Sequence, residues 1–157
     1  RSQFLSMTSG TGLMTHVFDH YGEYIDTELA SRGRGVLVSM VQGKTLGFGL
    51  FNLQERGRLF VGSNTEVYEG MIVGLHSRDN DLIVNPTKAK QLTNVRASGT
   101  DEHIVLTPPV VHSLEQAMEF IADDELVEVT PDNIRLRKRY LTENERKRMS
   151  RGLAARG

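Results

Sequence analysis

A run of polar and basic residues offers the clearest candidate chemistry in this sequence. The segment KAKQLTNVRASGTDE, residues 88–102, holds three cations, Lys88, Lys90 and Arg96, and has no hydrophobic face. Cations of this kind contact phosphate groups, and polar side chains between them can hydrogen-bond to ribose or to base edges. The polar side chains in this segment are Gln91, Thr93, Asn94 and Ser98. The residue types therefore indicate contact with RNA.

The length of the same segment supports this interpretation. Apolar stretches that are typical of strands lie on both sides, and the connection between them runs from Asn85 to Glu102. That exceeds the roughly 12 to 15 residues beyond which a loop tends to be functional or disordered. We therefore predict a long loop that is available to a partner.

A second basic feature lies near the carboxyl end. Apolar and basic residues alternate in NIRLRKRY, residues 133–140, so a strand would place Ile134, Leu136 and Tyr140 on one face. The other face would then carry a basic ridge made of Arg135, Arg137 and Arg139. Such a ridge could contact the RNA backbone, but charged residues also protect exposed edge strands, and the sequence leaves both interpretations open.

The net charge of −1 conceals an asymmetry along the chain. Residues 135–157 carry nine basic and two acidic side chains, a charge of +7, whereas residues 1–134 carry ten basic and eighteen acidic side chains, a charge of −8. A basic end suits a partner that carries phosphates, such as a nucleic acid, although basic tails are often only solvated.

Several other functions find little support in the sequence. The chain has no cysteine, which excludes disulfides, thiolate zinc sites and cysteine nucleophiles and fits a reducing compartment, so we expect a cytoplasmic protein. No apolar run approaches the roughly 18 residues of a membrane-spanning helix, so no membrane partner is expected. Gly43-Lys44-Thr45 resembles part of a phosphate-binding loop, but Val38 stands where the motif needs its first glycine, and we expect a strand to follow instead of a helix.

Metal binding and catalysis are not predicted either. His16 and His20 lie four positions apart, but in a segment that we expect to be a strand and a turn, where their side chains diverge. Asp123, Asp124 and Glu125 could bind a divalent ion weakly, although an exposed helix end explains them as well. The sequence also lacks a GxSxG nucleophile elbow. We therefore expect a chain that is not an enzyme and holds no cofactor or metal.

The elements that must position these residues indicate a mainly β protein with some helix, of the α+β class. Short apolar segments predict strands over residues 35–41, 44–51, 58–62, 71–77, 81–85 and 103–108. Their number and spacing favour a small β-barrel or a β-sandwich. Ser113 and Gln116 form a capping-box pattern before an apolar stripe at helical spacing, and Thr142 and Glu145 repeat the pattern, so a helix is expected after each.

Composition divides the chain into four parts. Residues 1–22 are expected to hold the end of a helix, a turn and a strand over Leu13–Phe18, and the polar residues 23–34 predict a linker. Residues 35–148 would form the β-barrel domain with one or two helices, and residues 149–157 a flexible basic tail. Because the first residues look like the middle of an element, we expect a fragment of a longer protein.

Several stretches together resemble known translation factors. Residues 1–21, RSQFLSMTSGTGLMTHVFDHY, resemble the closing helix and strand of the ferredoxin-like fifth domain of elongation factor G. The stretches EVYEGMIVG, LTNVRASGTDE, ELVEVTP and LTENERKR are similar to the carboxy-terminal domain of the TypA/BipA translational GTPases. The resemblance covers the chain from Arg1 to Arg148.

This resemblance implies a function that the residue types alone do not. Such proteins bind the bacterial ribosome, use a separate amino-terminal domain for GTP and Mg²⁺, and assist large-subunit assembly and stress or cold adaptation. Their carboxy-terminal domain is built around a small β-barrel and projects a loop toward ribosomal RNA and the acceptor end of the A-site tRNA. That loop matches residues 85–102 here. An alternative of another class is a structural module that only braces the GTPase domains, with its cations solvated.

Overall fold

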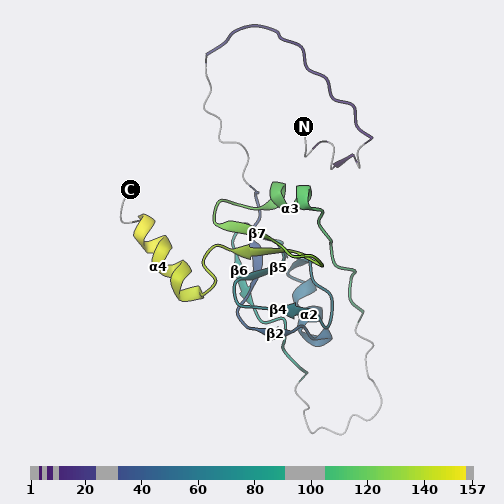
Figure 1. Cartoon of the computed structure of the whole chain (residues 1–157), viewed down its shortest axis with the longest axis vertical. Helices are drawn as coiled ribbons and strands as arrows, with labels where there is room; N and C mark the ends of the chain where they lie inside the picture. The colour runs from purple at the N-terminus through teal and green to yellow at the C-terminus, as the bar shows by residue number, and fades with distance from the viewer. Residues whose placement is uncertain (1–3, 5–6, 9–10, 24–31, 91–104, 155–157) are drawn as a thin grey trace.

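The structure, a computed structural model, describes residues 4, 7–8, 11–23, 32–90 and 105–154. Its body is an open six-stranded sheet in the order β6-β1-β5-β8-β7, with β3 also paired to β5 (Figure 1). The strands are β1 Val36–Ser39, β3 Gly57–Leu59, β5 Met71–His76, β6 Leu82–Val84, β7 Glu125–Val129 and β8 Ile134–Lys138. β1 and β6 run parallel, and the other pairs of this sheet are antiparallel.

Smaller elements surround this sheet. The short strands β2 (Gly43–Lys44) and β4 (Glu66–Val67) pair with each other as a separate ladder. Three helices complete the described fold, α2 (Gly47–Gln54), α3 (Leu114–Phe120) and α4 (Glu143–Ala154). In Figure 1, α3 and α2 lie above and below the sheet, and α4 extends away from it.

Apolar side chains fill both faces of the sheet, which explains the continuous apolar run of β1. Leu37 faces a cluster that includes Leu50 and Leu53 of α2, whereas Val36 and Val38 face a second cluster that includes Ala117 of α3. Alternate residues of one strand thus serve two cores, because successive side chains of a strand point to opposite faces.

α2 replaces the strand that the sequence predicts over residues 44–51. The alternation of apolar and small residues in this run imitates a strand, but Gly49, Leu50 and Leu53 are the buried residues of a helix and share one face. A Cβ at Gly49 would lie 2.6 Å from the carbonyl oxygen of Pro86. The missing side chain of this glycine therefore lets α2 pack directly against the backbone at Pro86.

Two further predicted strands are not formed. Residues 11–23, which include Leu13–Phe18, contain no helix or strand, and no described strand pairs with them. An extended segment without a paired neighbour has no partner for its backbone groups. The strand predicted over residues 103–108 is also wrong for its described part, residues 105–108, where the side chain of Gln54 bonds the backbone instead.

The α+β class is confirmed, but the predicted barrel is not closed. Closure would require β6 and β7 to pair, whereas they are opposite edges of the sheet. A side-chain contact links β8 to β6 instead. Nζ of Lys138, at the end of β8, lies 2.6 Å from the carboxylate of Asp81, just before β6.

Both predicted capping boxes are present. Ser113 accepts a hydrogen bond from the backbone N–H of Gln116 at 3.2 Å, and the Gln116 side chain accepts one from the N–H of Ser113 at 3.0 Å. Thr142 and Glu145 form the second box at the start of α4. α4 continues to Ala154, so the described part of the predicted tail is helical.

The proposed division of the chain into parts stays a prediction. Most of residues 1–10, which would end a helix, and residues 24–31 of the expected linker lie outside the described residues. Between them, residues 11–23 hold large apolar side chains that are almost fully exposed, such as Val17 (90%) and Tyr21 (94%).

Candidate nucleic-acid interface

The predicted RNA-contacting loop begins at a root that backbone contacts hold in place. The side-chain oxygen of Asn85 accepts hydrogen bonds from the backbone N–H and the hydroxyl of Thr87, at 3.0 and 2.9 Å. The carbonyl oxygen of the buried Pro86 accepts one from the N–H of Leu46, the residue that precedes α2, at 3.0 Å. These contacts fix the start of the loop against α2.

Two of the predicted RNA-contacting cations follow this root. Lys88 and Lys90 are exposed, and neither has a hydrogen-bond or ion-pair partner within the described part of the chain. The other loop residues predicted to contact RNA lie outside the described residues, namely Gln91, Thr93, Asn94, Arg96 and Ser98. Their role therefore stays a prediction.

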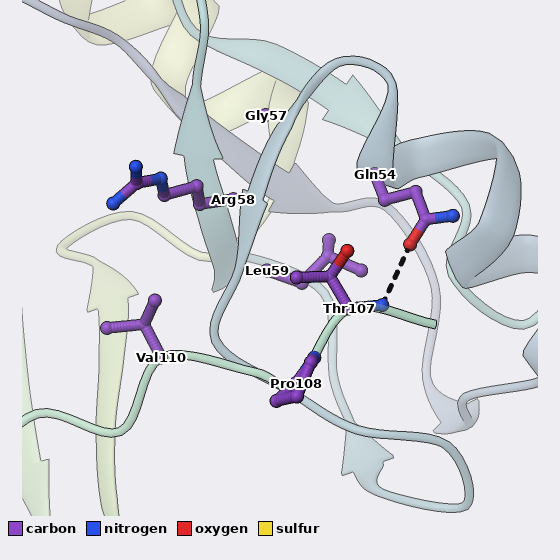
Figure 2. Close-up of a pocket in the computed structure, with 7 residues that line it drawn as sticks. All are labelled: Gln54, Gly57, Arg58, Leu59, Thr107, Pro108 and Val110. Atoms are coloured by element: carbon purple, nitrogen blue, oxygen red, sulfur yellow. Dashed lines mark hydrogen bonds between the residues drawn. The ribbon is translucent and has the colours of Figure 1, made fainter. Parts of the chain in front are cut away.

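The segment that leaves the loop lines a pocket of about 340 Å³ (Figure 2). The Gln54 side chain fixes this segment, because its Nε2 donates to the carbonyl oxygen of Val105 and its Oε1 accepts from the N–H of Thr107, each at 3.1 Å. Arg58 of β3 also lines the pocket, is exposed, and has no ion-pair partner among the described residues. Neither Gln54 nor Arg58 was predicted from the sequence. The role of Gln54 leaves no local pattern, because its amide binds a distant part of the backbone.

The basic ridge predicted on β8 is paired with a carboxylate of β7. β8 is not an edge strand, since it lies between β5 and β7. Glu128 of β7 lies 3.4 Å from Nη1 of Arg135 and 3.9 Å from Nε of Arg137. Burial and a hydrogen bond to Glu128 raise the pKa of Tyr68, which keeps its hydroxyl a donor to the same carboxylate. Arg139 lies beyond the end of β8 and is exposed, so the ridge is not continuous.

A buried ion cluster joins the start of β1 to β6, β7 and β8. The carboxylate of Glu125, whose side chain is 0% exposed, accepts two hydrogen bonds from Arg32 at 2.6 and 2.7 Å. Nζ of Lys138, whose side chain is 3% exposed, lies 3.0 Å from Glu125, 2.8 Å from Asp124 and 2.6 Å from Asp81. We call these five residues the buried ion cluster.

Mutual neutralisation keeps Glu125 and Lys138 charged despite their burial. Burial alone would raise the pKa of Glu125, but hydrogen bonds from Arg32, from the N–H of Ala122 and from Lys138 outweigh it and lower the pKa. Burial would lower the pKa of Lys138, but its three carboxylate partners raise it. The cluster therefore stabilises the fold and is not poised for proton transfer. The interpretation of residues 123–125 as an exposed helix end is wrong for Glu125, which begins β7.

The described part of the chain lacks three other features: a metal site, a membrane-spanning helix and a phosphate-binding loop. No group of three or more His, Asp or Glu residues there could hold a metal ion. None of its helices has the length and apolar character needed to cross a membrane. Thr45, after β2, is buried, and its hydroxyl donates to the carbonyl oxygen of Gly62 at 2.7 Å. A helix does follow this segment, contrary to expectation, but Val38 still lacks the backbone freedom of the glycine that a phosphate-binding loop requires.

Comparisons with known proteins place the chain in a family. The family model described as the TypA/BipA C-terminal domain matches residues 34–143. The large ribosomal subunit assembly factor BipA of Salmonella typhimurium is 60% identical over 152 residues, which cover 97% of this chain and 25% of that protein. The proteins of the same name from Haemophilus influenzae and Buchnera aphidicola are 60% and 58% identical over 151 residues, which cover 96% of this chain and 24% and 25% of theirs.

These matches confirm the resemblance to the TypA/BipA family, whereas the likeness of residues 1–21 to elongation factor G stays a prediction. The chain spans about a quarter of the length of the curated relatives it matches. The family model covers all strands of the sheet, with α2 and α3 and the segment between β6 and α3. The chain therefore belongs to the TypA/BipA C-terminal domain family.

Proposed function

We propose that this chain is the RNA-contacting domain of a translational GTPase that acts in assembly of the large ribosomal subunit. The similar proteins are named large ribosomal subunit assembly factors. The observation that carries the proposal is the pair of exposed cations Lys88 and Lys90, which lack a carboxylate partner in the described part of the chain. Cations that the protein leaves unpaired are available to phosphate groups.

In this proposal the chain acts by binding and catalyses no reaction. Residues 85–102 contact ribosomal RNA and the acceptor end of the A-site tRNA, as the family resemblance implies. GTP and Mg²⁺ are held by a separate domain, and the chain itself uses no cofactor. A role in stress or cold adaptation would follow from the assembly function.

The surroundings of the predicted basic residues differ, so we expect them to contribute unequally to RNA affinity. Arg135 and Arg137 are half-buried beside Glu128, so part of their charge is neutralised within the domain. Arg139 is exposed and follows them toward the basic helix α4. We expect Arg139 and the loop cations to contribute more to RNA affinity than the two arginines of β8.

Co-sedimentation of the 157-residue chain with large ribosomal subunits tests this proposal. Lys90→Ala and Arg96→Ala should each reduce the bound fraction while the thermal melt stays unchanged, and binding should weaken steeply as salt rises because counterions are released. Arg78→Ala is a matched control, since this exposed cation lies in the turn at the other end of β6. Binding that ignores salt, or loop variants that unfold the chain, would count against the proposal.

One observation favours a second candidate, a structural module that braces the GTPase domains. The side chains of Leu13 and Val17 are 89% and 90% exposed. Large apolar side chains that are exposed close together usually pack against another protein surface. If Lys90→Ala and Arg96→Ala bind large subunits like the wild type, while Val17→Ser in the full-length parent lowers its melting temperature, the bracing function is the better description.

A further inference from the structure

An open groove lies between α2 and the edge strand β6, next to the root of the loop. It has a volume of about 630 Å³. The residues that line it include Phe48 and Asn52 of α2, Arg56 just after α2, Ile83 of β6, and Asn85 and Lys88 of the root. All of these residues are described.

The described charged residues that line this α2/β6 groove are both positive. Arg56 and Lys88 are exposed and have no ion-pair partner within the described residues, and none of the described residues that line the groove is acidic. The surrounding chain is different, since residues 1–134 carry a net charge of −8. Charge complementarity therefore selects an anionic ligand.

The groove also offers one hydrogen-bond acceptor and one donor that the described residues leave free. Nδ2 of Asn52 donates to the carbonyl oxygen of Phe48 at 2.9 Å, which leaves Oδ1 as an acceptor. Asn85 uses its Oδ1 for Thr87, which leaves Nδ2 as a donor. Asparagine amides of this kind bond to base edges and ribose, whereas a peptide added to the edge of β6 would require backbone pairing and no cations.

Close packing holds the two walls of the groove together. A Cβ at Gly49 of α2 would lie 2.6 Å from the carbonyl oxygen of Pro86 and 3.2 Å from the backbone nitrogen of Lys88. The helix thus touches the backbone that carries Lys88. The backbone of α2 and of the loop root is therefore held in place before any ligand binds, which lowers the ordering cost of binding.

We propose that the α2/β6 groove binds an unpaired nucleotide of single-stranded RNA. Arg56 and Lys88 contact the phosphates on either side of this nucleotide, and the two asparagines contact its base or ribose. The volume suits such a ligand, because small-molecule pockets span about 300–1,000 Å³. This inference rests on the proposed function and deepens it, because it names unpaired RNA as the target and adds Arg56, Asn52 and Asn85 to the interface.

Fluorescence anisotropy with a labelled single-stranded RNA of about ten nucleotides tests the inference on the 157-residue chain. Arg56→Gln and Lys88→Gln should each lower the affinity several-fold and reduce the slope of log affinity against log salt by about 0.7, the value for one phosphate contact of a single strand. Arg78→Gln is the matched control, an exposed arginine in the turn at the other end of β6 that does not line the groove. A fully paired RNA hairpin should bind more weakly than the single strand.

The inference would be overturned by no binding of the single strand, by wild-type affinity in both groove variants, or by an equal loss in Arg78→Gln. Equal affinity for the paired hairpin would show that the groove does not select unpaired RNA. The same variants in co-sedimentation with large subunits separate the two proposals. If Lys90→Ala loses the subunit while the groove variants keep it and bind the oligonucleotide normally, only the groove inference fails. If the wild type does not bind the subunit, the proposed function fails.

Discussion

Replacing Glu125 with glutamine should strongly destabilise the chain. The carboxylate is fully buried and neutralises Arg32 and Lys138, whose side chains are 15% and 3% exposed. Glutamine has nearly the same size, but it removes the negative charge and presents an amide donor where two cations also donate. Removing one partner of a buried ion pair costs about 3–5 kcal/mol, because the remaining charge is left without compensation.

The other contacts in the buried ion cluster place the effect at the lower end of that range. Lys138 keeps Asp124 at 2.8 Å and Asp81 at 2.6 Å. Among the described residues, Arg32 keeps only backbone carbonyl oxygens and the ring of Phe120, which lies 4.6 Å from its guanidinium carbon. We therefore expect a loss of about 3 kcal/mol, which for a chain of this length lowers Tm by roughly 10 °C.

Urea unfolding and thermal melts of the 157-residue chain at neutral pH measure this loss. Glu119→Gln makes the same change at an exposed position of α3 and should shift the free energy of unfolding by less than about 0.5 kcal/mol. Because the loss falls mainly on Arg32, Arg32→Met combined with Glu125→Gln should destabilise less than the two single effects added together. A Glu125→Gln melt that matches the control, or strictly additive effects, would refute the reasoning.

The pH dependence provides a second test of the same residue. The folded-state pKa of Glu125 is lowered below the ordinary value of 4.5, so its stabilisation is complete above that value and is lost as the pH falls through the folded-state pKa. The wild type should therefore lose stability on the acid side of about pH 5 more steeply than Glu125→Gln does.

Three further predictions concern α2, α3 and the segment before α3. Gly49→Ala should destabilise the chain by about 1–3 kcal/mol, because the added Cβ would clash with the carbonyl oxygen of Pro86. Gly47→Ala in the same helix is the control: its Cβ would have no atom within 4 Å, so the change should be neutral or stabilising by up to about 1 kcal/mol. Equal melting temperatures for the two variants would contradict this prediction. Ser113→Ala removes the capping box and should cost about 0.5–2 kcal/mol in urea unfolding, and an unchanged midpoint would show that packing alone holds α3. Burial lowers the pKa of His112 below 6.5, so the stabilisation by the neutral ring is complete above that value and falls as the pH drops. His112→Phe should therefore make the free energy of unfolding less dependent on pH between about pH 7.5 and pH 5.5. If the variant loses stability as steeply as the wild type, another group causes the pH dependence.

Local patterns predicted the elements whose structure is decided locally. The capping boxes at Ser113 and Thr142 involve residues three positions apart, and both helices begin where these boxes predict. β1, β5 and β8 also lie within their predicted ranges, because apolar runs bounded by glycine or polar turns are typical of strands. α2 could not be predicted in this way, since the contact that favours the helix joins Gly49 to Pro86, far along the chain.

In the candidate site, too, local features could be predicted from the sequence and contacts between distant residues could not. Residue types alone identified Lys88 and Lys90 as exposed cations at the start of the loop, and the structure agrees on their exposure. The state of Arg135 and Arg137 could not be read from β8 alone, because it depends on Glu128 from the neighbouring strand. A strand pattern predicts which side chains share a face but not which side chains of the next strand lie opposite them.

The cations of this chain differ in a way that bears on function. Where a cation is buried or lies inside the sheet, a carboxylate accompanies it, as Glu125 accompanies Arg32 and Glu128 accompanies Arg135. Where Arg56 and Lys88 line the α2/β6 groove, the described residues supply none, although the first 134 residues contain eighteen acidic side chains. Because carboxylates are plentiful in the domain, their absence from the described lining of the groove is not a consequence of composition. We infer that the counter-charge for these two cations comes from another molecule, a role that the phosphate groups of the proposed RNA ligand would fill.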